Sequence, residues 1–193
     1  MVVNAEPEAQ VIEMGVQALD SYKADQIVTL GGGSVIDSAK LMKLRYEFPS
    51  ADLEELAAPF LDLRKRVVQY PTEKTNTLRL IAISTTSGTG SEVTPFAVLL
   101  DKERGRKITL ADYSLTPDVA IVDPQFVMSM PKALTADTGI DCLTHALEAG
   151  VSIFASPYTD SNAMMAIRLA LKYLPIAYNN PADEEARTMM HNA

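Results

Sequence analysis

Apolar residues recur along the first half of the chain with two different periods. Over residues 6–23 they are three and four positions apart, which predicts an amphipathic helix. Residues 26–30 form a short apolar run, as in a buried strand, and residues 34–46 return to helical spacing. The expected packing face of the first helix comprises Val11, Met14, Gly15, Ala18 and Tyr22. That of the second comprises Ile36, Ala39, Leu41 and Leu44.

Further apolar runs predict more strands. Residues 78–83 form one buried run, and residues 118–123, just before a proline, form another. Two β-rich runs, 93–100 and 106–110, flank a polar, glycine-containing turn, which predicts a hairpin. One or two short helices are expected around residues 53–58 and 60–66. Strands alternating with helices are typical of an α/β fold.

The pattern changes after Pro131, which we expect in the first turn of a helix. Helical spacing covers residues 139–154 and 158–173, and no convincing strand follows. The sequence therefore predicts an α/β domain over residues 1–127 and an all-helical domain over residues 128–193.

Composition narrows the class of protein. The chain has 193 residues, of which 47% are hydrophobic and 22% charged, so it can bury a core. Its net charge of -8 argues against nucleic-acid binding, which needs clustered Lys and Arg. No apolar stretch approaches the roughly 20 residues that span a bilayer. A single cysteine excludes an internal disulfide, and we expect a cytoplasmic protein.

Three glycines followed by Ser34 stand where the first strand meets the second helix. Glycines let a ligand approach the backbone, and the positive end of the helix favours a phosphate. Asp37 and Lys40 follow within two turns. The spacing is not G-x-G-x-x-G, so a merely tight turn remains the alternative.

A second loop, residues 85–91, contains five side-chain hydroxyls and two glycines after another buried strand. Ligands of α/β sheets gather at the carboxyl ends of strands, so both loops could face one ligand. A loop without any ligand remains the alternative for the second loop alone.

A carboxylate and an imidazole share one face of the first predicted helix after Pro131. Asp141 and His145 are four positions apart, so both can bind one divalent metal, with Glu148 nearby as a supporting group. The alternative is a carboxylate hydrogen-bonded to a histidine, because two ligands do not make a metal site. We expect Cys142 to be a small core residue and His191 to be exposed and not a ligand.

Together these segments resemble the iron-containing (group III) alcohol dehydrogenases, in particular the alcohol dehydrogenase half of the bifunctional aldehyde–alcohol dehydrogenases. The resemblance covers nearly the whole chain. The matching segments are Gly31-Gly32-Gly33-Ser34 with Asp37, Ala39 and Lys40; TTSGTGSEVT at 85–94; and Gly139, Asp141, Leu143 to Ala146 and Glu148.

The resemblance implies specific roles. Gly32, Gly33 and Ser34 would cradle the pyrophosphate of NAD, with Asp37 beside it. Asp141 and His145 match two of the family's four metal ligands, for Fe²⁺ or Zn²⁺. The side chains implied along the adenosine and ribose, including two on the hairpin, are Thr85, Thr86, Thr89, Thr94, Val98 and Lys107.

The implied fold is an incomplete Rossmann-like cofactor domain followed by the start of a helical metal-binding domain. The implied reaction is metal-assisted hydride transfer between NAD(H) and a short-chain alcohol or aldehyde, such as ethanol or acetaldehyde, in a homo-oligomeric full-length enzyme. The family's other two ligands lie on later helices, so we expect an interior fragment that is inactive alone. A glycerol-dehydrogenase-like or related superfamily enzyme, or an incomplete piece with an assembly role, are the alternatives.

Overall fold

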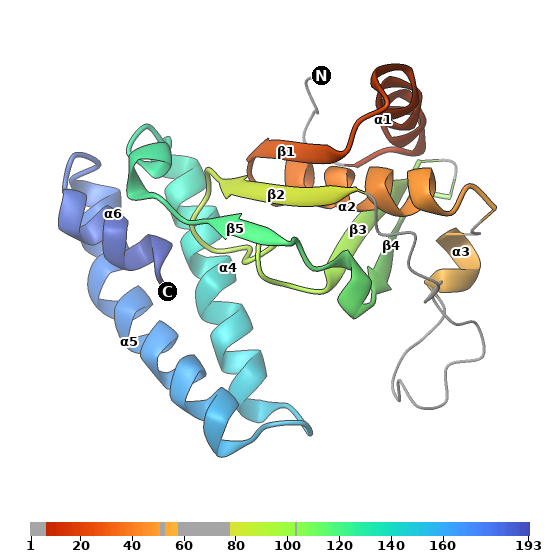
Figure 1. Cartoon of the computed structure of the whole chain (residues 1–193). Coiled ribbons are helices and arrows are strands. Elements are labelled where there is room, and N and C mark those ends of the chain that lie inside the picture. The colour runs from red at the N-terminus through yellow and green to blue at the C-terminus, as the bar shows by residue number, and fades with distance from the viewer. Residues whose placement is uncertain (1–6, 51–52, 58–77, 103) are drawn as a thin grey trace. The chain divides into compact units, whose positions relative to one another are not determined.

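The computed structural model describes residues 7–50, 53–57, 78–102 and 104–193, which form two compact units (Figure 1). The first unit consists of Met1–Ile83 and Ser91–Ile121, and it contains every strand of the described residues apart from the last residue of one of them. The second consists of Ser84–Gly90 and Val122–Ala193 and is helical apart from its loops. The expected α/β part followed by an all-helical part is therefore confirmed. The helix expected at residues 60–66 lies outside the described residues.

A three-stranded sheet and a hairpin form the β-structure of the first unit. The sheet has the order β1 (Gln26–Gly31), β2 (Arg79–Ser84), β5 (Val119–Ile121), and β2 runs parallel to β5. Strands β3 (Phe96–Asp101) and β4 (Arg106–Ala111) pair antiparallel around a turn that contains Gly105. β3 begins three residues later than expected, because residues 91–93 form a turn.

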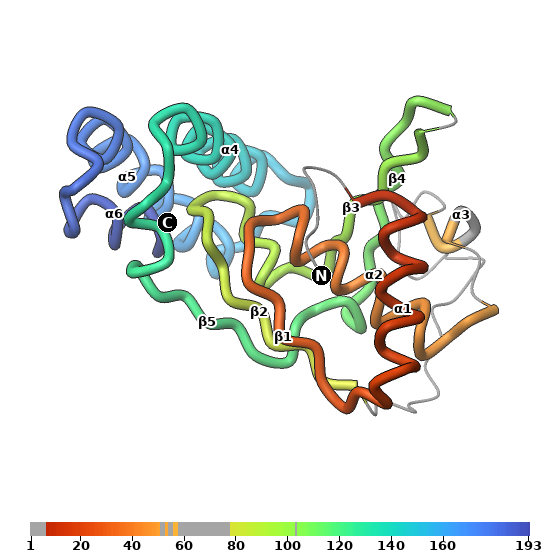
Figure 2. Tube along the Cα trace, turned by 90° about the horizontal axis from the view of Figure 1, so that it is seen from above, coloured from red at the N-terminus to blue at the C-terminus, as the bar shows by residue number. Residues whose placement is uncertain are grey.

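Helix α2 (Gly33–Glu47) is the centre of the first unit. It packs against β1, β3 and α1 (Ala9–Tyr22), and Figure 2 shows α1 running alongside it. The short α3 (Leu53–Leu56) lies against β4. A helix surrounded on several sides must bury residues all round its axis, and every residue of α2 from 38 to 44 is buried. The residues expected to pack on α2 are all buried: Ile36, Ala39, Leu41 and Leu44.

The face of α1 differs from the expected one. Met14 is 54% exposed and Tyr22 is 84% exposed, whereas Ile12 is buried. Gly15 sets the orientation of the helix, because a Cβ there would lie 2.4 Å from the sulfur of Met42 on α2. The period of the apolar pattern predicted the helix correctly, but the close approach to α2 decides which side is covered.

One face of the outer strands is uncovered within the described residues. Val28 on β1 is 60% exposed and Leu30 is 56% exposed, so the expectation of a fully buried β1 is wrong. Thr29 and Gly31 point to the other face and are buried. Val119 and Ile121 on β5 are also exposed. Parallel sheets are usually covered on both faces, so this apolar face is unusual for a folded chain.

Two long antiparallel helices dominate the second unit, α4 (Lys132–Val151) and α5 (Pro157–Asn179) (Figure 1). α4 starts seven residues before the expected position, and Pro131 is its N-cap rather than a first-turn residue. Ser156 caps α5 through a reciprocal capping box with Thr159. The helices approach closely, because a Cβ on Gly139 would lie 2.3 Å from a methyl carbon of Leu174.

A third helix, α6 (Glu184–His191), was not expected from the sequence. Arg187, which is almost wholly buried at 2% exposure, fixes this helix in place. It donates hydrogen bonds to the Thr135 hydroxyl at 2.7 Å and to the carbonyls of Met130 at 3.0 Å and Pro181 at 3.1 Å. Within the described helices, no segment combines the length and apolar character that a membrane span requires.

Candidate functional site

The glycine bend joins β1 directly to α2. Gly31 ends the strand, Gly32 is the N-cap in an extended conformation without a side-chain cap, and Gly33 begins the helix. A Cβ on Gly31 would lie 2.6 Å from the Cβ of Val35, so the bend requires a glycine there. The first amides of a helix have no acceptor within it, and they form its positive end. This geometry fits a phosphate group, and Ser34 lies in the first turn.

Asp37, the next predicted residue, faces protein groups. Its carboxylate accepts hydrogen bonds from the Ser91 hydroxyl and from the Val98 amide at 3.0 Å. Burial raises the pKa of Asp37, and the hydrogen bonds from Ser91 and Val98 and the nearby Lys40 ammonium oppose that shift. The structure therefore brings Asp37 and Val98 together, with Asp37 linking α2 to β3.

Lys40 supports the same link from the next turn of α2. It is 1% exposed, and its Nζ donates hydrogen bonds to the carbonyls of Thr94 at 2.9 Å and Phe96 at 2.6 Å. Burial lowers the pKa of Lys40 to about 8, although Asp37 and Glu92 pull in the opposite direction. Lys40 thus fixes the backbone that carries Thr94. The sequence showed this lysine but gave no sign that its charge is buried.

Val98 and Lys107 lie on the same face of the hairpin. Val98 pairs with Thr109 and Leu100 pairs with Lys107, and side chains alternate between the two faces of a strand. The opposite face carries Ala97, Leu99, Ile108 and Leu110, all of which are buried. The face with Lys107 is thus the more exposed face of the hairpin.

The hydroxyl-rich loop, Ser84–Gly90, belongs to the helical unit. Ser84 donates a hydrogen bond to the carbonyl of Thr86 at 3.0 Å, which curls the loop back on itself. Gly88 has a φ of 148° and lies against Thr138 of α4, where a Cβ would be 1.9 Å from the carbonyl oxygen. Thr85, Thr86 and Thr89 are all half-buried.

Two features of this loop bear on ligand binding. The Thr86 hydroxyl is buried and has no hydrogen-bond partner among the described residues, as expected for a group that meets a ligand. Thr138 precedes Asp141 by three positions, so it lies on the same side of α4. The loop therefore contacts α4 one turn before the predicted metal ligands.

His191 differs from its expectation. It is 8% exposed, and its Nδ1 lies 3.1 Å from the hydroxyl of Ser87, which is also buried. Position near the chain end suggested exposure, but α6 packs this residue inward. No motif in the sequence connects these two residues, because they are 104 positions apart.

The predicted metal ligands converge. Oδ1 of Asp141 and Nε2 of His145 are 3.6 Å apart on α4, and their side chains are 44% and 52% exposed. Carboxylate and imidazole are donors that both iron and zinc accept. Among the described residues there is no group of three or more His, Cys, Asp or Glu side chains that could hold a metal, so a metal bound at this pair would need further ligands.

Cys142 does not contribute to this pair. It is buried, at 5% exposure, as expected for a core residue. Burial and, to a lesser extent, Asp141 raise the pKa of its thiol, which disfavours the thiolate that a metal needs.

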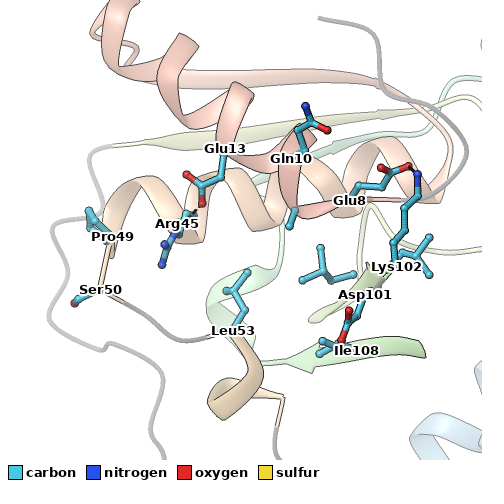
Figure 3. Close-up of a pocket in the computed structure, with 13 residues that line it drawn as sticks. Glu8, Gln10, Glu13, Arg45, Pro49, Ser50, Leu53, Asp101, Lys102 and Ile108 are labelled. Carbon is cyan, nitrogen blue, oxygen red and sulfur yellow. Dashed lines mark hydrogen bonds and ion pairs between the residues drawn. The ribbon is translucent and has the colours of Figure 1, made fainter. Parts of the chain in front are cut away.

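A separate open cavity of about 850 Å³ lies in the first unit at the ends of α1, α2 and the hairpin (Figure 3). Charged side chains line it, and they are paired: Arg45 with Glu13 at 3.1 Å and Lys102 with Glu8 at 2.6 Å. None of the sequence-predicted site residues lines this cavity. It is therefore not part of the candidate site.

Two family models match this chain. The model described as iron-containing alcohol dehydrogenase matches residues 1–124. The model described as Fe-containing alcohol dehydrogenase family, C-terminal, matches residues 135–193. A curated relative, aldehyde-alcohol dehydrogenase 2 of Entamoeba histolytica, is 52% identical over 191 residues, which is 99% of this chain and 22% of the relative. The chain thus spans about a fifth of that relative's length.

Solved structures show the same similarity. An iron-containing alcohol dehydrogenase from Thermococcus thioreducens has a TM-score of 0.85 and 37% identity, covering 98% of this chain and 48% of its own. A sulfoacetaldehyde reductase from Bifidobacterium kashiwanohense, solved in complex with NAD+, has a TM-score of 0.82 and 34% identity. That match covers 97% of this chain and 47% of the reductase, so this chain spans about half of each structure.

Proposed function

Since this chain belongs to the iron-containing alcohol dehydrogenase family, we propose that it carries dinucleotide- and metal-binding residues of an NAD-dependent dehydrogenase for a short-chain alcohol such as ethanol. In the oxidising direction the alcohol loses a hydride to NAD⁺ and its hydroxyl proton to solvent, which gives the aldehyde and NADH. The reverse reaction turns acetaldehyde into ethanol. In this proposal the enzyme is cytoplasmic, and the full-length protein forms homo-oligomers.

In this proposal the pyrophosphate of the dinucleotide meets the first unit at the start of α2. The amides of Gly32, Gly33 and Ser34 at the start of α2 receive the pyrophosphate, which the positive end of the helix favours. Asp37 lies beside the pyrophosphate in this proposal, and its carboxylate also accepts hydrogen bonds from Ser91 and from Val98 on β3. The residues that we propose along the adenosine and ribose are Thr85, Thr86, Thr89, Thr94, Val98 and Lys107.

Asp141 and His145 hold the metal in this proposal, together with further ligands. The single observation that carries the proposal is their 3.6 Å convergence on one face of α4. A divalent ion such as Fe²⁺ or Zn²⁺ supplies Lewis acidity toward the alcohol oxygen. The two side chains fix the position of that ion, and α4 holds both of them on neighbouring turns.

The metal proposal can be tested with the only two histidines in the chain. Titration with Mn²⁺, followed by proton NMR, should broaden the ring signals of His145 at lower metal concentrations than those of buried His191, which lies farther from the proposed site. Asp141→Asn should raise the Mn²⁺ concentration needed for half-maximal broadening of His145 about tenfold, because one of the two proposed ligands is lost. Asp20→Asn, which makes the same change at an exposed carboxylate on α1, is the matched control and should change little. Equal broadening of both histidines would contradict the proposal.

The phosphate site can be tested without disturbing the fold. Gly32 is an extended N-cap, a position where Asp is preferred, so Gly32→Asp should leave α2 at least as stable. The added carboxylate occupies the place of a phosphate and should weaken NADH binding more than tenfold in a fluorescence titration. Gly32→Ser adds a side chain of similar size without charge and should bind NADH more tightly than the Asp variant. Unchanged binding by Gly32→Asp would refute the phosphate site.

A further inference from the structure

A buried Ser–His pair joins the hydroxyl-rich loop to the last helix of the second unit. Ser87 is 6% exposed, His191 is 8% exposed, and the Ser87 hydroxyl lies 3.1 Å from Nδ1 of His191. Ser87 stands between Thr86 and Thr89, which we propose as cofactor residues. Neither Ser87 nor His191 has a role in that proposal.

Neighbouring contacts fix the same loop. Gly88 lies against the backbone of Thr138, and the hydroxyl of Ser84 holds the carbonyl of Thr86. The bond between Ser87 and His191 is the side-chain contact that ties the middle of the loop to a different helix. Hydroxyls that must meet a dinucleotide in one orientation bind it better when their backbone is already held.

The anchor at His191 is itself rigid. Asp183 caps α6 by accepting a hydrogen bond from the Ala186 amide at 2.9 Å. Arg187, one turn before His191, bonds three groups outside α6, and Met190 is buried in the core of the unit. His191 is the last residue of its helix, but the contacts along the whole length of α6 hold it in position.

We propose that His191 is a positioning residue for the dinucleotide, and that it acts through its hydrogen bond with Ser87 to orient Thr85, Thr86 and Thr89. The inference rests on the proposed function, since it needs this loop to bind NAD(H). His191 touches neither cofactor nor metal. Its imidazole ring fixes the loop through Ser87, and the threonines of the loop bind NAD(H).

Three substitutions test the bond. Ser87→Ala and His191→Phe each remove it and should raise the Kd for NADH about tenfold, the effect of a lost buried hydrogen bond on an ordered loop. His191→Asn places an amide near the position of Nδ1 and should restore most of the affinity. The double variant Ser87→Ala with His191→Phe should bind no more weakly than either single variant, because both delete the same contact.

Control measurements separate positioning from general stability. Ala163→Gly weakens α5 at a buried position outside the cluster that packs on α6, so it should lower the Tm without changing the Kd measured below the melting range. If His191→Phe lowers only the Tm and leaves the Kd unchanged, His191 is structural and the inference is wrong. Additive effects in the double variant would equally contradict a shared bond.

Failure of the positioning role can be distinguished from failure of the proposed function. If the parent chain binds NADH and Gly32→Asp abolishes that binding, while the Ser87 and His191 variants bind normally, only the positioning role fails. Hydrogen exchange tests the anchor without any ligand. His191→Phe should speed the exchange of the amides of residues 85–89 about tenfold relative to those of α5. Unchanged exchange would overturn the anchor even if NADH binding proved absent.

Discussion

The backbone of Gly88 passes so close to Thr138 that a Cβ at position 88 would lie 1.9 Å from the Thr138 carbonyl oxygen. The glycine has a φ of 148°, which L side chains rarely adopt. The loop and α4 thus meet backbone to backbone, with no side chain that could yield. Any residue other than glycine must push the loop away from α4.

Gly88→Ala should therefore lower the free energy of unfolding by about 3 kcal/mol, since overpacking adds to backbone strain. Gly105→Ala is a matched control, because Gly105 also has a positive φ, of 60°, but nothing lies within 4 Å of its Cβ position. That variant should lose only about 1 kcal/mol from the backbone conformation. Urea denaturation measures both, and equal losses would contradict the close approach at Gly88.

Lys40 should make stability depend on pH above neutrality. Its pKa is about 8 in the folded chain, against an ordinary value of 10.5, because burial disfavours the charge. Between these values the unfolded chain holds a proton that the folded chain has lost, so the free energy of unfolding gains from rising pH. The full gain is on the order of 3 kcal/mol.

The measurement compares urea denaturation of the parent chain and Lys40→Met at pH 7.5 and pH 10. The difference in unfolding free energy between parent and variant should grow toward pH 10, because only the parent titrates at this site. Lys40→Met should also be less stable at both values, since the carbonyls of Thr94 and Phe96 lose a donor. Parallel pH curves would show that burial does not perturb Lys40.

Arg187 should be among the residues of the helical unit whose loss costs the most stability. Arg187→Met keeps the apolar stem but leaves three acceptors without their donor, on Thr135, Met130 and Pro181. The expected loss is about 3 kcal/mol. Arg168→Met on α5 removes an exposed arginine and should change stability by less than about 0.5 kcal/mol. Similar midpoints for the two variants would contradict the role of the buried guanidinium.

The uncovered face of the sheet should promote self-association of the chain. Val28 and Leu30 on β1 are more than half exposed, and Val119 and Ile121 on β5, at the other edge of the same sheet, are also exposed. Exposed apolar patches of this kind favour aggregation. The double substitution Val28→Thr with Leu30→Thr should lower concentration-dependent light scattering while leaving the far-UV circular dichroism unchanged. Scattering that does not respond would show that another surface drives association.

Local patterns were enough to predict most of the fold. The 3.6-residue period predicted α1 and α2, and the alternation of strands and turns predicted the hairpin within a few residues. The same period wrongly placed Met14 and Tyr22 on the packing face. Periodicity gives the apolar side of a helix only approximately, and the tight contact of Gly15 with Met42 then sets how the helix is rotated. The sequence did not predict α6, because this helix is short and polar and is held by partners of Arg187 that are distant in the sequence.

The site divides in the same way. Spacing alone predicted that Asp141 and His145 share a face, and their 3.6 Å separation confirms it, while metal binding stays a prediction. The roles of Asp37 and Lys40 as links to β3 depend on contacts across more than fifty residues, which no local pattern contains. The pairing of Ser87 with His191 depends on tertiary structure in the same way.

The labelling rate of Cys142, the only thiol of the chain, can report how often the buried face of α4 opens. A soluble disulfide reagent can reach it only when α4 detaches from its neighbours, and the raised pKa slows even that encounter. The labelling rate in native buffer then depends on how often the helical unit opens. Because Cys142 sits beside Asp141, anything that clamps this turn should lengthen the labelling time.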